Sequence, residues 1–206
     1  MKIVELRLET HCLEALKTFY TETLELPLAS ESKRSFAFRA GASTVHFFKS
    51  HQLEEPFYHF AFNIPENQLP QARQWLASRA QLIGQGGKDQ FHFESWNADA
   101  LYFYDPAGNI VEFIARHNLN NRSAARFSAK SILGVSEIGY PVEDVRLFSA
   151  HIRDSLNLKL WDGDETQFAA VGDEEGMFII VPLERIWFPT DKPADSFPVT
   201  VDVSSE

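Results

Sequence analysis

The sequence predicts an α+β protein made of repeated β-α-β-β-β modules, which pair into a cup of curved antiparallel sheets with the helices outside. The main observation is a repeat: a strand followed by an amphipathic helix opens the chain and recurs near residue 131. Three leucines follow each helix at the same spacing, as Leu24, Leu26 and Leu28 in the first copy and Leu156, Leu158 and Leu160 in the later one. Because one such module is too small to bury both of its faces, the modules are expected to pair.

The first module covers residues 1–50. Residues 2–9 alternate apolar and charged side chains, which is the period-2 pattern of a strand. Thr10 can cap the helix expected over 13–23, whose apolar side chains share one face. The remaining expected elements are strands at 35–39 and 44–49, a turn at 40–42 between them, and a polar, proline-terminated linker at 51–56.

The second module covers residues 57–117 and is more divergent. A strand is expected at 58–63 and a helix near 69–78. Asp105-Pro106-Ala107-Gly108 predicts a tight hairpin turn, because proline fixes φ and glycine accepts a positive φ. Further strands are expected at 91–94, 100–104 and 109–116.

A polar stretch at 118–130 is interpreted as a linker to a third module within 131–206. That module runs over 132–182, and a last strand at 197–203 could begin a fourth copy. Three modules leave one face unpaired, which predicts either a homodimer or completion by the 197–203 strand.

Composition restricts the class of protein. The chain has 206 residues, 44% of them hydrophobic and 23% charged, as is usual for a globular protein. A net charge of −10 argues against nonspecific binding to nucleic acid or to an anionic membrane surface. No apolar run approaches the roughly 20 residues of a membrane span, and no secretory leader is recognisable. With a single cysteine, Cys12, these features favour a reducing cytoplasm.

Two motifs resemble the vicinal oxygen chelate superfamily of glyoxalase, bleomycin-resistance and extradiol dioxygenase proteins. The motifs are Leu13-x5-Phe19-Tyr20-x3-Leu24-x-Leu26 and Ser95-Trp96-Asn97-x4-Leu101-Tyr102-Phe103-x-Asp105-Pro106-x-Gly108-Asn109-x2-Glu112-Phe113. The resemblance covers residues 1–116 and, less closely, 131–182. It implies that two modules form a cup with a metal ion on its floor, held by residues on the first and last strands of both modules.

Carried over residue by residue, the resemblance implies the ligands Glu5, His46, His59 and Glu112. Strand alternation agrees, because each candidate lies between apolar neighbours that should face the helices. Imidazole and carboxylate donors suit a divalent Zn, Ni, Co, Mn or Fe ion. The family usually has His on the first strand and Glu on the last strand of module one, and this order is reversed here.

Ordinary structural roles compete with this interpretation. Glu5 could belong to a solvated strand face, His46 could be a partly exposed strand histidine, and His59 could be a hydrogen-bonded core residue. In the third module, Glu137 corresponds to Glu5, but residues 179–181 supply no donor, so that half is expected to be metal-free.

The resemblance implies a metal-dependent lyase or isomerase of the glyoxalase type. Its substrate would be a small molecule with vicinal oxygens, and Glu5 or Glu112 would move the proton. Two alternatives remain open: a protein of the bleomycin-resistance kind that binds a small molecule without catalysis, and an extradiol-type ring-cleaving dioxygenase. No motif for an organic cofactor is present. The possible substrate contacts are His92, Glu94, Trp96 and Tyr102.

Overall fold

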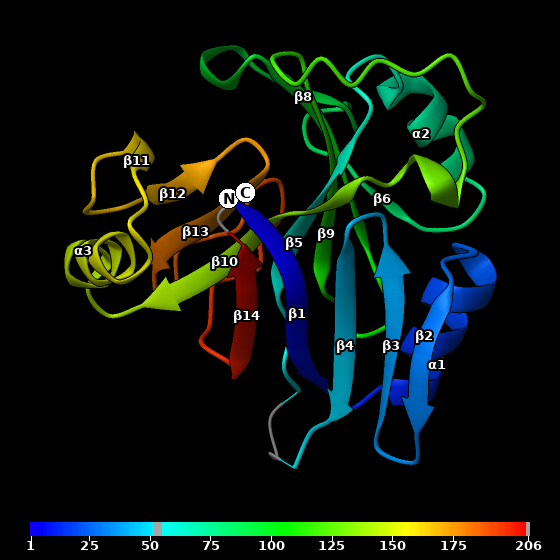
Figure 1. Cartoon of the computed structure of the whole chain (residues 1–206), viewed down its shortest axis with the longest axis horizontal. Coiled ribbons are helices and arrows are strands. Elements are labelled where there is room, and N and C mark those ends of the chain that lie inside the picture. The colour runs from blue at the N-terminus through cyan, green and yellow to red at the C-terminus, as the bar shows by residue number, and fades with distance from the viewer. Residues whose placement is uncertain (52–54, 205–206) are drawn as a thin grey trace.

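Strands are the main regular elements of the computed structural model, which describes residues 1–51 and 55–204 (Figure 1). The elements of the first module are β1 (Lys2–Thr10), α1 (Leu13–Thr18), the π-helical turn η1 (Phe19–Thr23), β2 (Leu28–Ser32), β3 (Ser35–Ala40) and β4 (Ser43–Lys49). The expected helix over 13–23 is therefore α1 together with η1. Strand β2 was not anticipated from the sequence.

The second module agrees with the expected order except that a short strand, β6 (Leu82–Ile83), was not predicted and that Glu94 lies in a turn. Its elements are β5 (His59–Ile64), α2 (Leu69–Leu76), β6 (Leu82–Ile83), β7 (Phe91–Phe93), the short 3-10 turn η2 (Glu94–Trp96), β8 (Ala98–Tyr104) and β9 (Ile110–Arg116). Glu94 was expected in a strand and instead begins η2. Gly108 has φ +75°, as the predicted turn before β9 requires.

The third module follows the short turn η3 (Ala129–Ser131). Its elements are β10 (Gly134–Val142), α3 (Val145–Leu156), β11 (Leu160–Gly163), β12 (Ala169–Asp173) and β13 (Gly176–Pro182). Asp144 caps α3 by accepting a hydrogen bond from the Leu147 amide at 2.9 Å. The expected terminal strand is β14 (Val199–Ser204). No helix among the described residues is long and apolar enough to cross a membrane.

The strands form one sheet whose main path is β2-β3-β4-β1-β10-β5-β9-β8-β6. The sheet is mixed, because the first and last strands of each module run parallel: β1 with β4, β5 with β9 and β10 with β13. The expected α+β fold is therefore confirmed, with parallel pairs within modules and antiparallel pairs between them.

The modules are joined by antiparallel strand pairs. The second module joins the third through antiparallel β5 and β10, in register from Asn63↔Gly134 to Phe60↔Ile138. The first module joins β14, which lies beside β1 along Lys2–Leu8 (Figure 1). Between β1 and β10 the register contains only the pair Ile3↔Val135. The second module is thus paired along its first strand with the third module, whereas the cup of modules 1–50 and 57–117 stays a prediction.

Two apolar clusters lie on opposite faces of the sheet. Phe60, Phe62 and Phe113 belong to the larger cluster, which also contains the buried faces of α1 and α2. Ala61 and Ile114, their neighbours in sequence, belong to the second cluster. Because strand side chains alternate between faces, His59 and Glu112 project to the side of Ala61 and Ile114, as predicted.

Candidate metal centre

Three adjacent strands bring together a group of three ligand-type side chains. His59 lies on β5, Glu112 on β9 and Glu137 on β10, and one ligand atom from each lies within 4.8 Å of the other two. All three side chains are buried. Ala61 is in register with both Glu112 and Glu137, and its small side chain leaves the space between the two carboxylates open.

The imidazole of His59 is oriented as a ligand would be. Its Nδ1 lies 3.1 Å from the carbonyl oxygen of Ile110, and because a carbonyl only accepts, Nδ1 is the donor. The lone pair is therefore on Nε2, which lies 3.7 Å from Glu112 Oε2. Burial, and then the charge of Arg185, lower the pKa of His59 to about 4, so the ring is neutral and able to ligate at physiological pH.

The two carboxylates carry more negative charge than the protein compensates. Arg116 is fully buried and its Nη2 donates to Glu137 Oε1, but Nε and Nη1 have no hydrogen-bond partner. Burial, followed by the charge of Glu137, raises the pKa of Glu112 well above its usual range; Arg116 and Tyr102 oppose this shift. Burial also raises the pKa of Glu137. One guanidinium for two buried carboxylates leaves a place for either a proton or a cation.

A cavity of about 360 Å³ opens onto these residues. Its walls are rich in aromatic side chains, namely Phe93, Trp96, Tyr102, Phe168, Trp187 and Phe188. Trp187 lies with its ring centroid 4.9 Å from that of His59. Tyr102 is in register with Glu112 on the neighbouring strand, and it opposes the rise in the Glu112 pKa. Aromatic walls of this kind keep bulk water from the acidic group and accept a flat ligand.

The structure separates the four predicted ligands into two pairs. His59 and Glu112 are in the group with Glu137, whereas Glu5 and His46 lie elsewhere. There, His46 Nδ1 is 3.7 Å from Glu5 Oε1, and Arg7 bonds both Glu5, at 2.8 and 2.9 Å, and Asp202, at 2.9 Å. The side chains of His46 and Glu5 are 20% and 28% exposed, against 6% and 3% for His59 and Glu112. Glu5 is thus engaged by an arginine at the protein surface.

Glu137 is the residue that the sequence analysis did not place at the site. The repeat in the sequence could have identified it, because Glu137 occupies in β10 the position that the predicted ligand Glu5 occupies in β1. The third module therefore contributes a ligand-type residue, contrary to the expectation that it would have no part in a metal site. In the first module, Arg7 of β1 is in register with His46 of β4. At the equivalent place in the third module, Gly139 of β10 is in register with Ile179 of β13, and isoleucine cannot bind a metal, so β13 supplies no fourth donor there.

The predicted substrate contacts divide in the same way. Trp96 and Tyr102 line the cavity, whereas His92 and Glu94 do not. His92 is 59% exposed and forms an ion pair with Asp99, its Nδ1 lying 2.8 Å from Oδ1. The Trp96 indole donates to Asp162 Oδ2 at 2.6 Å, which fixes the ring across the junction between the second and third modules.

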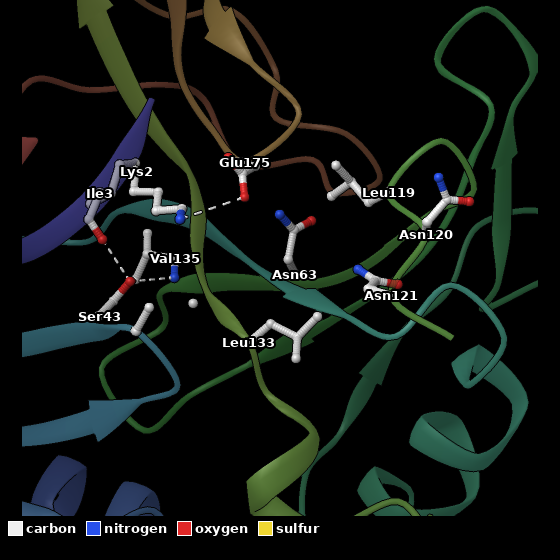
Figure 2. A pocket seen from close by; sticks show the side chains of 12 residues that line it. Lys2, Ile3, Ser43, Asn63, Leu119, Asn120, Asn121, Leu133, Val135 and Glu175 are labelled. Carbon is white, nitrogen blue, oxygen red and sulfur yellow. Dashed lines mark hydrogen bonds and ion pairs between the residues drawn. The ribbon is translucent and has the colours of Figure 1, made fainter. Parts of the chain in front are cut away.

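A second cavity, of about 400 Å³, lies where β1 and β10 meet (Figure 2). At its edge the Ser43 hydroxyl donates to the Ile3 carbonyl at 2.6 Å and accepts from the Val135 amide at 2.8 Å. This cavity shares no lining residue with the aromatic one, and within the described part of the chain it contains no group of three metal-ligand side chains. The hydroxyl bridge identifies it as the junction of the first module with the rest of the molecule.

Comparison with solved structures identifies the fold. A candidate dioxygenase from Bacillus subtilis superposes with a TM-score of 0.58 at 16% identity, over 88% of this chain and 63% of that one. Glyoxalase I from Zea mays superposes with a TM-score of 0.56 at 14% identity, over 88% of this chain and 66% of that one. A glyoxalase/bleomycin resistance protein/dioxygenase from Nocardioides is 22% identical over 61% of this chain and 89% of its own, with a TM-score of 0.48. No family model matches the sequence, and no curated protein matches it.

Proposed function

The chain has the fold of the vicinal oxygen chelate superfamily, and from this premise we propose that it is a metal-dependent lyase or isomerase acting on a small molecule with vicinal oxygens. His59, Glu112 and Glu137 would hold a divalent transition-metal ion. The observation that carries the proposal is the His59 ring, whose Nδ1 is committed to Ile110 while Nε2 faces two buried carboxylates served by one arginine.

The donor set fits such an ion. One neutral imidazole and two carboxylates suit Mn, Fe, Zn or a related divalent metal, and its positive charge would offset the burial and the charge of Glu137, which together raise the pKa of Glu112. When bound, the ion would act as a Lewis acid toward two adjacent substrate oxygens.

The protein's own residues would move the proton. In the lyase or isomerase reaction, a Glu112 carboxylate oxygen accepts a proton from the carbon beside the substrate carbonyl and returns it to the neighbouring atom. Tyr102, which is in register with Glu112 and lines the cavity, would orient the carboxylate, and the aromatic walls would exclude water from the proton being moved.

A second candidate function, ring-cleaving dioxygenation, fits the number of ligands but not their kind, because such enzymes use two histidines and one carboxylate and this group has one histidine and two carboxylates. Three protein ligands leave three positions on an octahedral ion, enough for a chelating diol and O₂. The identity of the bound metal separates the two functions, because dioxygenation requires iron and consumes O₂, whereas proton transfer does not.

The first experiment is the metal content of protein purified without chelator or metal-affinity resin, measured by plasma mass spectrometry. We expect close to one ion per chain, lost in His59→Ala and retained in His92→Ala, since His92 is exposed and outside the cavity. Iron with O₂ uptake on catechol would select the dioxygenase. Protein that is empty and stays empty after incubation with Mn, Fe, Co, Ni and Zn would refute the metal enzyme and leave a metal-free binding protein.

A further inference from the structure

The cavity contains one cationic side chain that the proposed chemistry does not use. Arg185 is the only Lys or Arg among the described residues that line it. No hydrogen bond or ion pair of its guanidinium occurs within residues 1–51 and 55–204. Arg185 Cζ lies 5.4 Å from the centroid of the Phe168 ring, which supports one face of the guanidinium and leaves its N–H groups without acceptors.

Burial lowers the pKa of Arg185, and the carboxylate of Asp164 opposes this shift through its charge but not through a hydrogen bond. Asp164 Oδ1 accepts from the amides of Thr166 and Gln167, both at 2.8 Å. Asp162 Oδ2 accepts from Trp96 at 2.6 Å. Arg116, by comparison, reaches the acidic group from behind and is paired with Glu137. The Arg185 guanidinium is partly exposed and has no hydrogen-bond partner among the described residues, so a ligand anion can bind it without breaking an internal bond.

The segment that carries Arg185 is held in place by backbone hydrogen bonds. The Ala194 amide donates to the Arg185 carbonyl at 2.8 Å, and the Trp187 amide donates to the Lys192 carbonyl at 2.9 Å. Arg185, Trp187 and Phe188 therefore reach the cavity from one braced loop between β13 and β14. The guanidinium is in position before a ligand arrives, which lowers the entropic cost of binding.

The cavity beside this cation accepts a flat ring. The Phe188 ring lies edge-on to Tyr102, with centroids 5.8 Å apart, and Phe93 is 5.9 Å from Phe188. Trp187 covers His59 on the same side. The wall thus presents aromatic faces and edges between the acidic group and the guanidinium, an arrangement that favours a planar unsaturated ligand.

We propose that this site selects an aromatic carboxylic acid, with the carboxylate paired to Arg185 and the ring between the aromatic walls. The substrate's vicinal oxygens would lie toward His59, Glu112 and Glu137, and this last part alone rests on the proposed function. Arg185 is then the residue that determines specificity for an anionic substrate, because a guanidinium binds a carboxylate through two parallel hydrogen bonds.

The test is calorimetric titration of metal-free protein with two pairs of probes: benzoate against benzamide, and 3,4-dihydroxybenzoate against catechol. Each pair shares a ring and differs in the carboxylate. We expect the acids to bind about 10- to 100-fold more tightly than their neutral partners, as for a hydrogen-bonded charge pair. Arg185→Gln should abolish the preference without weakening catechol, and Arg185→Lys should keep part of it.

Arg146→Gln is the matched control, because Arg146 is an exposed arginine on α3 outside the cavity. Thermal unfolding of each variant establishes that it is folded before it is titrated. Equal affinity for acid and neutral probe, an undiminished preference in Arg185→Gln, or no binding of any probe would overturn the proposal. Repeating the titrations with Mn²⁺ separates it from the proposed function: a failed metal site would abolish metal-enhanced diol binding but leave the carboxylate preference intact.

Discussion

Asp105 shows how one buried side chain determines the position of two strands that carry the site. Its Oδ1 accepts from the amides of Ala107 and Asn109, at 2.9 and 3.1 Å, which closes the turn before β9. Its Oδ2 accepts from Tyr20 and from the Asn109 side chain, both at 2.7 Å. Asn109 in turn accepts from the Tyr58 amide at 2.8 Å, beside the start of β5. The turn therefore sets the relative position of β5 and β9, and with it His59 and Glu112.

Burial raises the pKa of Asp105 from 3.8 to about 6. A folded-state pKa above the unfolded one means that the folded protein holds the proton more tightly, so this group's contribution to stability is lost as pH rises from about 4 to about 6. The Tyr20 hydroxyl opposes the shift, because it donates to the ionised form.

Tyr20→Phe should therefore cost more at high pH than at low pH. We expect a loss of about 1.5–3 kcal/mol at pH 7.5, where the bond is to a charged group, and about 1 kcal/mol at pH 4.5, where Asp105 is protonated. Urea unfolding of parent and variant at both pH values measures the difference. Tyr104→Phe, at a less buried tyrosine, is the control; a Tyr20→Phe loss that does not change with pH would contradict this account of Asp105.

At the scale of elements, the turn between β3 and β4 connects the first module to the rest of the chain. Gly41 has φ +56°, and a Cβ built there would lie 2.1 Å from the Leu133 carbonyl oxygen. The next amide, of Ala42, donates to that same carbonyl at 2.9 Å. Glycine is needed here for two reasons, conformation and close backbone approach.

Two alanine substitutions separate these reasons. Gly86 has a similar φ, +61°, but nothing lies within 4 Å of its virtual Cβ. Gly86→Ala should cost only the left-handed strain, about 1–2 kcal/mol. Gly41→Ala should cost a further 1–3 kcal/mol or so, because the backbone of Leu133 must move. Urea midpoints measure both losses, and equal losses would mean that contact with Leu133 does not matter.

At the scale of the whole molecule, the same architecture occurs twice, with different side chains. Both β1 and β10 have an irregular register at the same place, between Ile3 and Glu5 and between Val135 and Glu137. Glu137 is in register with Ala61 of β5, and Glu5 is in register with Asp202 of β14. The molecule therefore has two equivalent halves: one is built around the strand pair β10 and β5, and the other around the pair β1 and β14.

Side chains on the paired strand decide which half can hold an ion. His59 lies two residues before Ala61, whereas Thr200 lies two residues before Asp202, so β14 offers no imidazole. Arg7 stands where β10 has Gly139, and it bonds both Glu5 and Asp202. In that half the guanidinium of Arg7, whose side chain is 35% exposed, supplies the positive charge. At Gly139 a Cβ would lie 2.7 Å from Trp187, so the other half keeps its space for the indole.

Because of this contrast, we expect one of two matched substitutions to weaken metal binding and the other to leave it unchanged. Glu137→Gln should lower the affinity for Mn²⁺ or Zn²⁺ at least about tenfold, the effect usual for losing a ligand or its immediate support. Glu5→Gln should leave it unchanged. Calorimetric titration measures both, and thermal unfolding of the metal-free variants controls for lost folding where Arg116 loses its partner. Loss of metal in Glu5→Gln alone would place the site in the first module.

The sequence by itself determined the module, its longer strands and the face on which His59 and Glu112 lie, but not the strands β2 and β6. These properties depend on local alternation, turn chemistry and the repeat, all of which act between residues close in the chain. The same reasoning predicted the positive φ of Gly108 and the terminal strand now seen as β14. It also placed Glu137 in the position equivalent to Glu5.

Only the tertiary structure decided which modules pair, because that choice depends on hydrogen bonds between strands far apart in sequence. β10 pairs with β5, and β14 with β1, so Glu137 joins His59 and Glu112 while Glu5 and His46 remain with Arg7. Arg185 enters the cavity on a loop without any periodic pattern, held by the backbone bonds of Ala194 and Lys192. Side chains recruited in this way have no local signal, since their position depends on the packing of the whole chain.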